Sequence, residues 1–111
     1  MRIRTEDFTD AVLSEEDLLD TAKVSDALAH PARILMFRHI LSQNTSGKTV
    51  IGKDLVSLTG YSQATVSQHL SKLVTSGLVQ RKQVGTSTSY FAHVGVLSTY
   101  IDSIKKIGIK P

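Results

Sequence analysis

The sequence predicts a mainly helical domain with a small β-hairpin, on three observations. Residues 62–72 combine an apolar back with a polar front at helical spacing. Residues 78–93 have the pattern of two short strands around a glycine turn. A last segment, 96–107, again carries an apolar stripe at helical spacing. A chain of 111 residues holds one domain, so residues 1–111 are expected to fold as a single unit.

The first helix is predicted over about residues 17–29, after an N-terminal arm of residues 1–16. At its start, the Ser14 hydroxyl is placed to accept a hydrogen bond from the backbone N–H of Asp17. Acidic residues gather there, near the positive end of the helix dipole. The helix has a mostly apolar face made by Leu18, Leu19, Ala22, Val24, Ala27 and Leu28.

Pro31 begins a second helix, because proline is tolerated in the first helical turn. Its expected core face consists of Ile34, Leu35, Phe37, Ile40 and Leu41. A short strand is predicted over 49–51 and a short helix over 54–58. Gly60 suits the left-handed position that ends such a helix.

The next helix, from Ser62 to about Gly77, is backed by Val66, Leu70 and Leu73. Strands follow over 78–84 and about 89–93, with a turn at 85–88 between them. In the last helix, about 95–108, Leu97, Ile101 and Ile104 share one stripe. The order α-α-α-α-β-β-α, with a short helix, turn and helix before a hairpin, is a winged helix-turn-helix whose wing is the hairpin.

The front of the 62–72 helix suggests contact with DNA, since its side chains can match base edges and phosphates. Ser62 suits capping and a phosphate contact, and Gln63, Thr65 and Gln68 suit base edges. The full predicted DNA-binding set is Ser62, Gln63, Ala64, Thr65, Ser67, Gln68, His69, Lys72, Arg81, Lys82, Thr86, Ser87 and Thr88. Residues 60–111 carry a net charge of +5 and residues 1–59 a net charge of −2, as expected if the second half meets phosphates.

Composition excludes several other classes of protein. The chain has no cysteine, which excludes disulfides, thiolate metal sites and thiol switches. No apolar run reaches the length of a membrane span, and the first residues lack an apolar signal core, so a cytoplasmic protein without membrane contact is expected. No triad or carboxylate pair stands out, so an enzyme is not expected.

The chain resembles the ArsR/SmtB-type winged-helix repressors of bacteria and archaea over roughly residues 22–107. The resemblance rests on Ala27–Ile34 (ALAHPARI), Tyr61–Leu70 (YSQATVSQHL), Leu73, Ser76–Val79 (SGLV), Val84-Gly85 and Tyr90. It implies a homodimer held by the first and last helices, binding to a palindromic double-stranded operator, and repression of transcription. Family members often carry arginine just after the wing glycine, where this chain has Thr86.

The residues themselves also favour a dimer. An apolar stripe of Leu97, Tyr100, Ile101 and Ile104 is hard to bury within so small a domain. A two-fold dimer would cover it and set two reading helices about one turn of DNA apart. Leu18 and Leu19 are the expected contributors from the first helix.

Many members of this family sense metals, but the resemblance fails at both metal sites. The positions that match the thiolate site hold Ile51, Gly52 and Lys53. At the last-helix site only His93 falls near a ligand position, among the apolar Phe91, Ile104 and Ile107. His30, before Pro31, is expected to cap a helix instead. No metal and no cofactor are therefore predicted.

The sequence thus predicts a homodimeric, sequence-specific DNA-binding transcriptional regulator. It is expected to act as a repressor and not to sense metal through these two sites. An alternative is a winged-helix module that uses the same surface to bind a protein. The sequence gives no indication of an effector.

Overall fold

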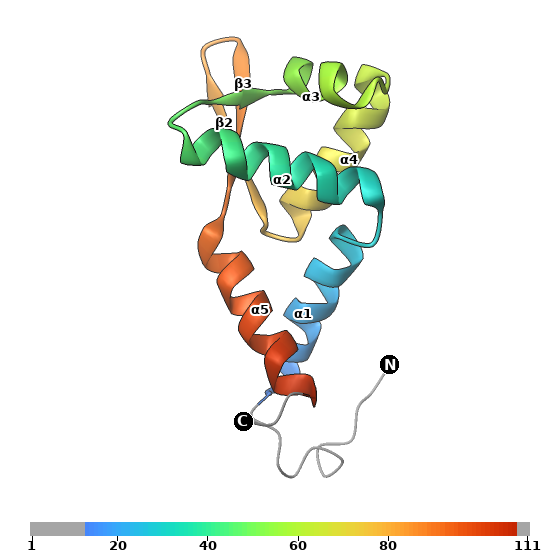
Figure 1. The fold of residues 1–111 in the computed structure, drawn as a ribbon, viewed down its shortest axis with the longest axis vertical. Coiled ribbons are helices and arrows are strands. Elements are labelled where there is room, and N and C mark those ends of the chain that lie inside the picture. Colours follow the sequence, from blue (N-terminus) through green and yellow to red (C-terminus); the bar gives the residue numbers. More distant parts are fainter. Residues whose placement is uncertain (1–12, 109–111) are drawn as a thin grey trace.

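The computed structural model describes residues 13–108, and the part of the predicted N-terminal arm before residue 13 lies outside them. Five helices and three strands follow one another in this range (Figure 1). They are α1 (Glu15–Ala27), α2 (Pro31–Thr45), β1 (Val50–Ile51), α3 (Gly52–Thr59), α4 (Gln63–Thr75), β2 (Val79–Val84), β3 (Ser87–Ala92) and α5 (Val94–Gly108). The predicted winged helix-turn-helix is confirmed, with α3 and α4 as its two helices.

Helix starts follow the predicted local chemistry. Ser14 accepts from the Asp17 N–H at 3.0 Å, and Asp17 accepts in return from the Ser14 N–H at 3.2 Å, which completes a capping box. Pro31 opens α2, and the ring nitrogen Nδ1 of His30 accepts from the Ala32 N–H at 3.1 Å. Gly60 ends α3 with a φ of 73°, in the left-handed region expected for a glycine there.

The core lies where α2, α3 and α4 pack on the small sheet. Its fully buried side chains come from every one of these elements: Met36, Ile40, Val50, Leu55, Val66, Leu70, Leu73, Leu78 and Val79. The predicted core face of α2 is wrong in part, because Ile34 and Leu35 are 52% and 42% exposed. Met36 fills the core in their place, since the face of α2 that meets α4 is centred on Met36 and Ile40.

The sheet is larger than the predicted hairpin. β1 pairs antiparallel with β3, so that the strand order is β1-β3-β2. The wing turn is also shorter than predicted: Val84 pairs with Ser87, which leaves Gly85 and Thr86 as the only loop residues. Gly85, with a φ of 62°, suits the first central position of a tight two-residue hairpin turn. Ser87 and Thr88 therefore belong to a strand rather than to the turn.

The first and last helices pack on each other. α1 and α5 run side by side away from the body that holds α3, α4 and the wing (Figure 1). The hydroxyls of Ser25 and Tyr100 are hydrogen-bonded at 2.9 Å and join these two helices. No helix within residues 13–108 has the length and apolar character that crossing a membrane requires.

Candidate nucleic-acid interface

Helix α4 has one buried face and one exposed face. Val66, Leu70 and Leu73 are at most 1% exposed, whereas the opposite side carries exposed polar or small side chains. These are Ser62, Gln63, Ala64, Ser67, Gln68 and Lys72, with Thr65 half-buried beside them. Helical periodicity therefore places most of the predicted reading residues on one accessible surface.

The N-terminus of α4 is capped by Ser62, as predicted. Its hydroxyl oxygen accepts from the Thr65 N–H at 3.2 Å and donates to the Thr65 hydroxyl at 3.0 Å. The first N–H groups of the helix still point outward, where they favour an anion such as a phosphate. The start of α4 therefore combines exposed side chains that are predicted to contact base edges with N–H groups that suit an anion.

A polar groove of about 290 Å³ separates the start of α3 and α4 from the wing. Gln63 and Ser67 lie on its α4 side, and Thr86, Ser87 and Thr88 lie on its wing side. The structure thus brings together predicted residues from two separate segments. It also adds Lys53, an exposed cation at the start of α3 that the sequence reasoning considered only as a failed metal ligand.

The two predicted wing cations lie on opposite faces of β2, because successive side chains in a strand alternate. Arg81 pairs with Tyr90 across the hairpin, and its guanidinium lies 6.0 Å from the centre of the Tyr90 ring. Tyr90 also lines the groove beside α4. Lys82 pairs with Ser89 and therefore projects from the other face. Of the two, Arg81 therefore lies on the same face of the hairpin as Tyr90.

His69 differs from the other predicted residues of α4. It is half-buried, with its ring 4.6 Å from the His30 ring and 5.9 Å from the Tyr61 ring. Nη1 of Arg33 lies 3.3 Å from Nδ1 of His69, and since a guanidinium only donates, Nδ1 is the acceptor. This packing gives His69 a role inside the protein that the sequence did not indicate, and its contact with DNA stays a prediction.

Arg33 connects α4 to the end of α1. Its Nε donates to the Ala27 carbonyl at 2.7 Å and its Nη2 donates to the Asp26 carbonyl at 3.2 Å. These carbonyls belong to the last turn of α1, where a cation is favourable for the helix dipole. Arg33 was part of the sequence pattern ALAHPARI, but no signal in the sequence assigned it this function.

Lys72 forms an ion pair with Asp26 at 3.8 Å. Both side chains are more than half exposed, and such a surface pair contributes little to stability. Lys72 therefore remains available to an incoming phosphate at small cost.

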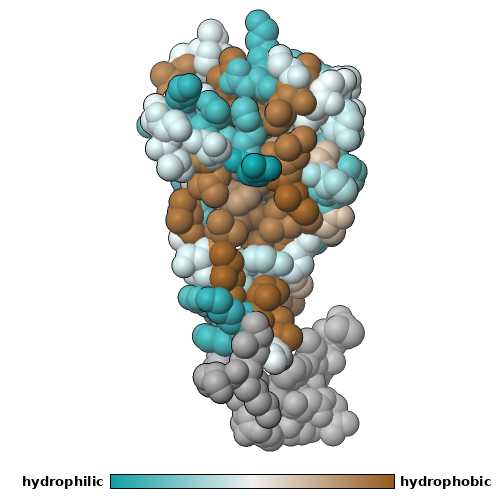
Figure 2. Space-filling model, viewed as in Figure 1, coloured by the Kyte–Doolittle hydropathy of each residue, from teal (hydrophilic) through white to brown (hydrophobic). Residues whose placement is uncertain are grey.

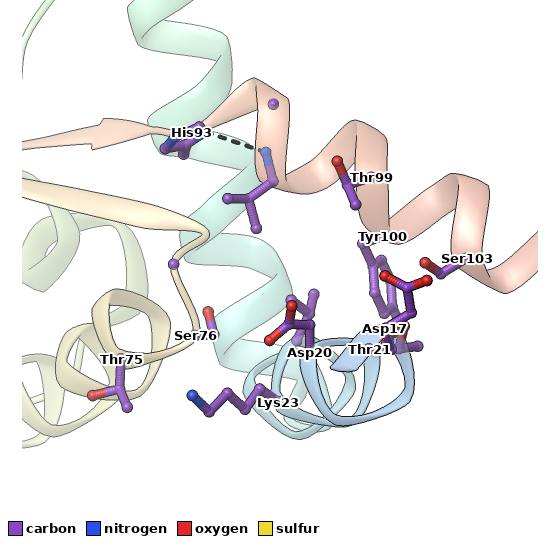
Figure 3. Close-up of a pocket in the computed structure, with 14 residues that line it drawn as sticks. Asp17, Asp20, Thr21, Lys23, Thr75, Ser76, His93, Thr99, Tyr100 and Ser103 are labelled. Atoms are coloured by element: carbon purple, nitrogen blue, oxygen red, sulfur yellow. Dashed lines mark hydrogen bonds between the residues drawn. The ribbon is translucent and has the colours of Figure 1, made fainter. Parts of the chain in front are cut away.

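His93, which lies near an expected metal-ligand position, has another partner. Nδ1 of His93 accepts from the Val96 N–H at 3.2 Å at the start of α5, and the dashed line in Figure 3 marks this bond. Within residues 13–108, no three His, Asp or Glu side chains are grouped so that they could hold a metal ion.

The middle of the chain matches a known protein family. Residues 46–81, which include the helix-turn-helix, match the family model described as bacterial regulatory protein, arsR family. The predicted resemblance to the ArsR family is confirmed. No curated protein sequence matches the chain.

Several solved structures share the fold. An ArsR-like transcriptional regulator from Rhodococcus sp. RHA1 aligns with a TM-score of 0.72 at 22% identity, over 84% of this chain and 83% of that one. The homodimeric winged helix-turn-helix DNA-binding domain of Mb0332 from Mycobacterium bovis aligns with a TM-score of 0.63 at 25% identity, over 82% and 83%. The transcriptional repressor BigR from Xylella fastidiosa aligns with a TM-score of 0.60 at 18% identity, over 97% and 100%.

The contacts of His69 generate a prediction about pH. Partial burial, followed by the nearby His30 and Arg33, lowers the pKa of His69 below its usual 6.5. The unfolded chain therefore takes up this proton at higher pH than the folded protein does. The free energy of unfolding is expected to fall as pH drops below about 6.5, and His69→Gln is expected to flatten that decline. Urea unfolding at a series of pH values measures both.

The matched control is His39→Gln, which removes a histidine of α2 outside the ring cluster. This variant shows how the loss of a histidine that has no part in the ring cluster affects stability. Equal slopes in the parent and the His69→Gln protein would contradict the account of the cluster.

Proposed function

We propose that this chain is a DNA-binding transcriptional regulator that reads duplex DNA with α4. The observation that carries the proposal is the division of α4 into a fully buried back and an exposed front of Gln63, Ser67, Gln68 and Lys72. A helix of this kind fits the major groove, while the wing and the start of α3 flank the adjoining phosphates. The arsR-family match over residues 46–81 supports the same function.

The regulator acts as a homodimer. Leu19, Ile101 and Ile104 are 61%, 44% and 41% exposed on the two helices that stand apart from the body. Apolar surface gathers in the middle of the view in Figure 2, near the level at which α2 lies above α1 and α5 in Figure 1. The Tyr100 ring packs between the two helices, hydrogen-bonded to Ser25, while Leu18 and Leu97 are half-buried and continue the exposed apolar surface. A two-fold partner covers it and doubles the number of reading helices, which suits a palindromic operator.

The regulator is a repressor that does not sense metal through the thiolate or last-helix positions at which many ArsR-family members do. Ile51, Gly52 and Lys53 offer no thiolate, and the His93 ring caps α5. Occupancy of an operator that overlaps a promoter excludes polymerase, so loss of the chain is expected to raise transcription of the genes that carry the operator.

Salt dependence of binding tests the function directly. Duplex affinity is expected to fall steeply with salt, because each neutralised phosphate adds about −0.9 to the slope of log K against log salt concentration. Arg81→Gln is expected to make the slope of a dimer shallower by about 2, and Lys48→Gln, in the loop between α2 and β1 and outside the predicted DNA-binding set, serves as the matched control. Fluorescence anisotropy with promoter and random duplexes measures the slopes. Negligible binding to both duplexes at low salt would instead favour a protein-binding module.

Gln68 tests the reading role of α4. A bidentate amide contact with a base edge contributes about 1–3 kcal/mol of discrimination, so Gln68→Ala is expected to relax sequence choice by that amount. Selection from a random duplex library measures the preference of each protein. Gln43→Ala, on α2 and away from the interface, should keep the parent's preference. An unchanged preference in the Gln68→Ala protein would remove this residue from the reading set.

The dimer surface is tested by placing a charge on it. Ile101→Asp buries an unpaired carboxylate in the proposed interface, so it is expected to convert the dimer to a monomer. Leu58→Asp alters a similarly exposed apolar residue on α3, at 38%, and is expected to leave the dimer intact. Sedimentation velocity distinguishes the species. A parent protein that sediments as a monomer would contradict the proposal.

A further inference from the structure

A cavity of about 540 Å³ lies between α1, α5 and the turn that follows α4. Figure 3 shows the side chains of these three segments that line it. The volume falls within the range of about 300–1,000 Å³ that is usual for small-molecule sites. None of the DNA-contacting residues proposed above lines this cavity, so it is separate from the reading surface.

The inner wall of the cavity is apolar and well fixed. Val24 is 4% exposed, and Val96 and the Tyr100 ring pack against the core next to it. The hydrogen bond between Tyr100 and Ser25 holds the ring between the two helices. The wall therefore offers a flat aromatic surface that does not have to rearrange when a ligand binds.

The charges around this wall are mainly negative. Asp17 and Asp20 project from α1 into the cavity, Asp17 beside Tyr100 and Ser103, and Asp20 between Asp17 and Ser76 (Figure 3). Lys23 is the one lining side chain with a permanent positive charge, and it extends toward the other end, beside Thr75. Hydroxyl groups of Thr21, Thr99 and Ser103 complete the acidic end and can accept hydrogen bonds from a cation.

We propose that this cavity binds a small organic ammonium compound with a flat apolar body. The ammonium group lies between the Asp17 and Asp20 carboxylates, where charge-assisted hydrogen bonds form. The apolar body lies against the Tyr100 ring and Val24. A cation close to the face of an aromatic ring gains further attraction from the ring quadrupole.

The cavity is also placed where a ligand would affect DNA reading. Thr75, Ser76 and Gly77 line it at the end of α4, and α1 and α5 form its other walls. One ligand therefore touches both the reading helix and the two helices of the proposed dimer surface. The use of the site for an effector rests on the proposed function, whereas binding itself does not.

Tryptamine is a suitable probe, since it joins an ammonium group to an aromatic body. Calorimetry on the full chain without DNA is expected to show saturable binding. Amide NMR shifts are expected at Thr21, Gly77 and Tyr100. 3-Methylindole, which lacks the amine, and indole-3-acetate, which carries a negative charge, are expected to bind more weakly than tryptamine.

Asp20→Asn tests the charge without disturbing the capping box, which uses Asp17. It is expected to weaken tryptamine binding about fivefold, as for a partly exposed ion pair. Asp102→Asn removes a carboxylate of α5 that does not line the cavity and is expected to leave the affinity unchanged. Circular dichroism confirms that both variants fold.

Four results would overturn the site: no saturable binding, equal affinity for tryptamine and 3-methylindole, shifts confined to other surfaces, or equal weakening by the two variants. Adding duplex DNA separates this proposal from the proposed function. Binding of tryptamine by a chain that binds no duplex would support the site and refute the regulator. Binding of tryptamine with unchanged duplex affinity would support the site and refute its use for an effector.

Discussion

The packing of one face of α4 is the constraint on which the rest of the structure depends. Val66, Leu70 and Leu73 occur at spacings of four and three residues and are almost completely buried against α2, α3 and the sheet. Rotating the helix about its axis would expose these side chains and bury the amide and ammonium groups of Gln68 and Lys72. Both changes are costly, so the core determines which side chains face outward.

The surroundings of α4 connect its orientation to the rest of the fold. The Arg33 guanidinium donates hydrogen bonds both to the carbonyls at the end of α1 and to His69 in the middle of α4. Any change in the pairing of α1 and α5 can therefore reach the reading helix through a short series of directional contacts. Because the cavity between α1 and α5 also touches the end of α4, the molecule has two physical connections between the proposed dimer helices and the proposed DNA surface.

Much of the fold could be predicted from local sequence patterns. Ser14, Pro31, Gly60 and Ser62 act through their own backbone or that of near neighbours, so their roles could be assigned without a tertiary structure. The apolar spacing of α4 likewise carried enough information to identify its two faces. The match to the arsR-family model covers the same segment.

The features that sequence reasoning missed depend on contacts between distant residues. Ile34 and Leu35 were expected in the core but are exposed. When two neighbouring faces of a helix are both apolar, the sequence does not show which of them packs against the rest of the protein. The pairing of β1 with β3 joins residues about 40 positions apart. The Arg33–His69 contact spans 36 positions and has no local signature.

Amide NMR spectra of the chain, recorded with and without a DNA duplex from the region upstream of its own gene, test the central claim most directly. The account predicts that the largest shifts fall on the exposed front of α4, at Gln63, Ser67 and Gln68, and on the wing. It also predicts that the buried Leu73 and the far side of α3 change little. Shifts concentrated on Leu35 and Leu58, with the α4 front unaffected, would contradict it.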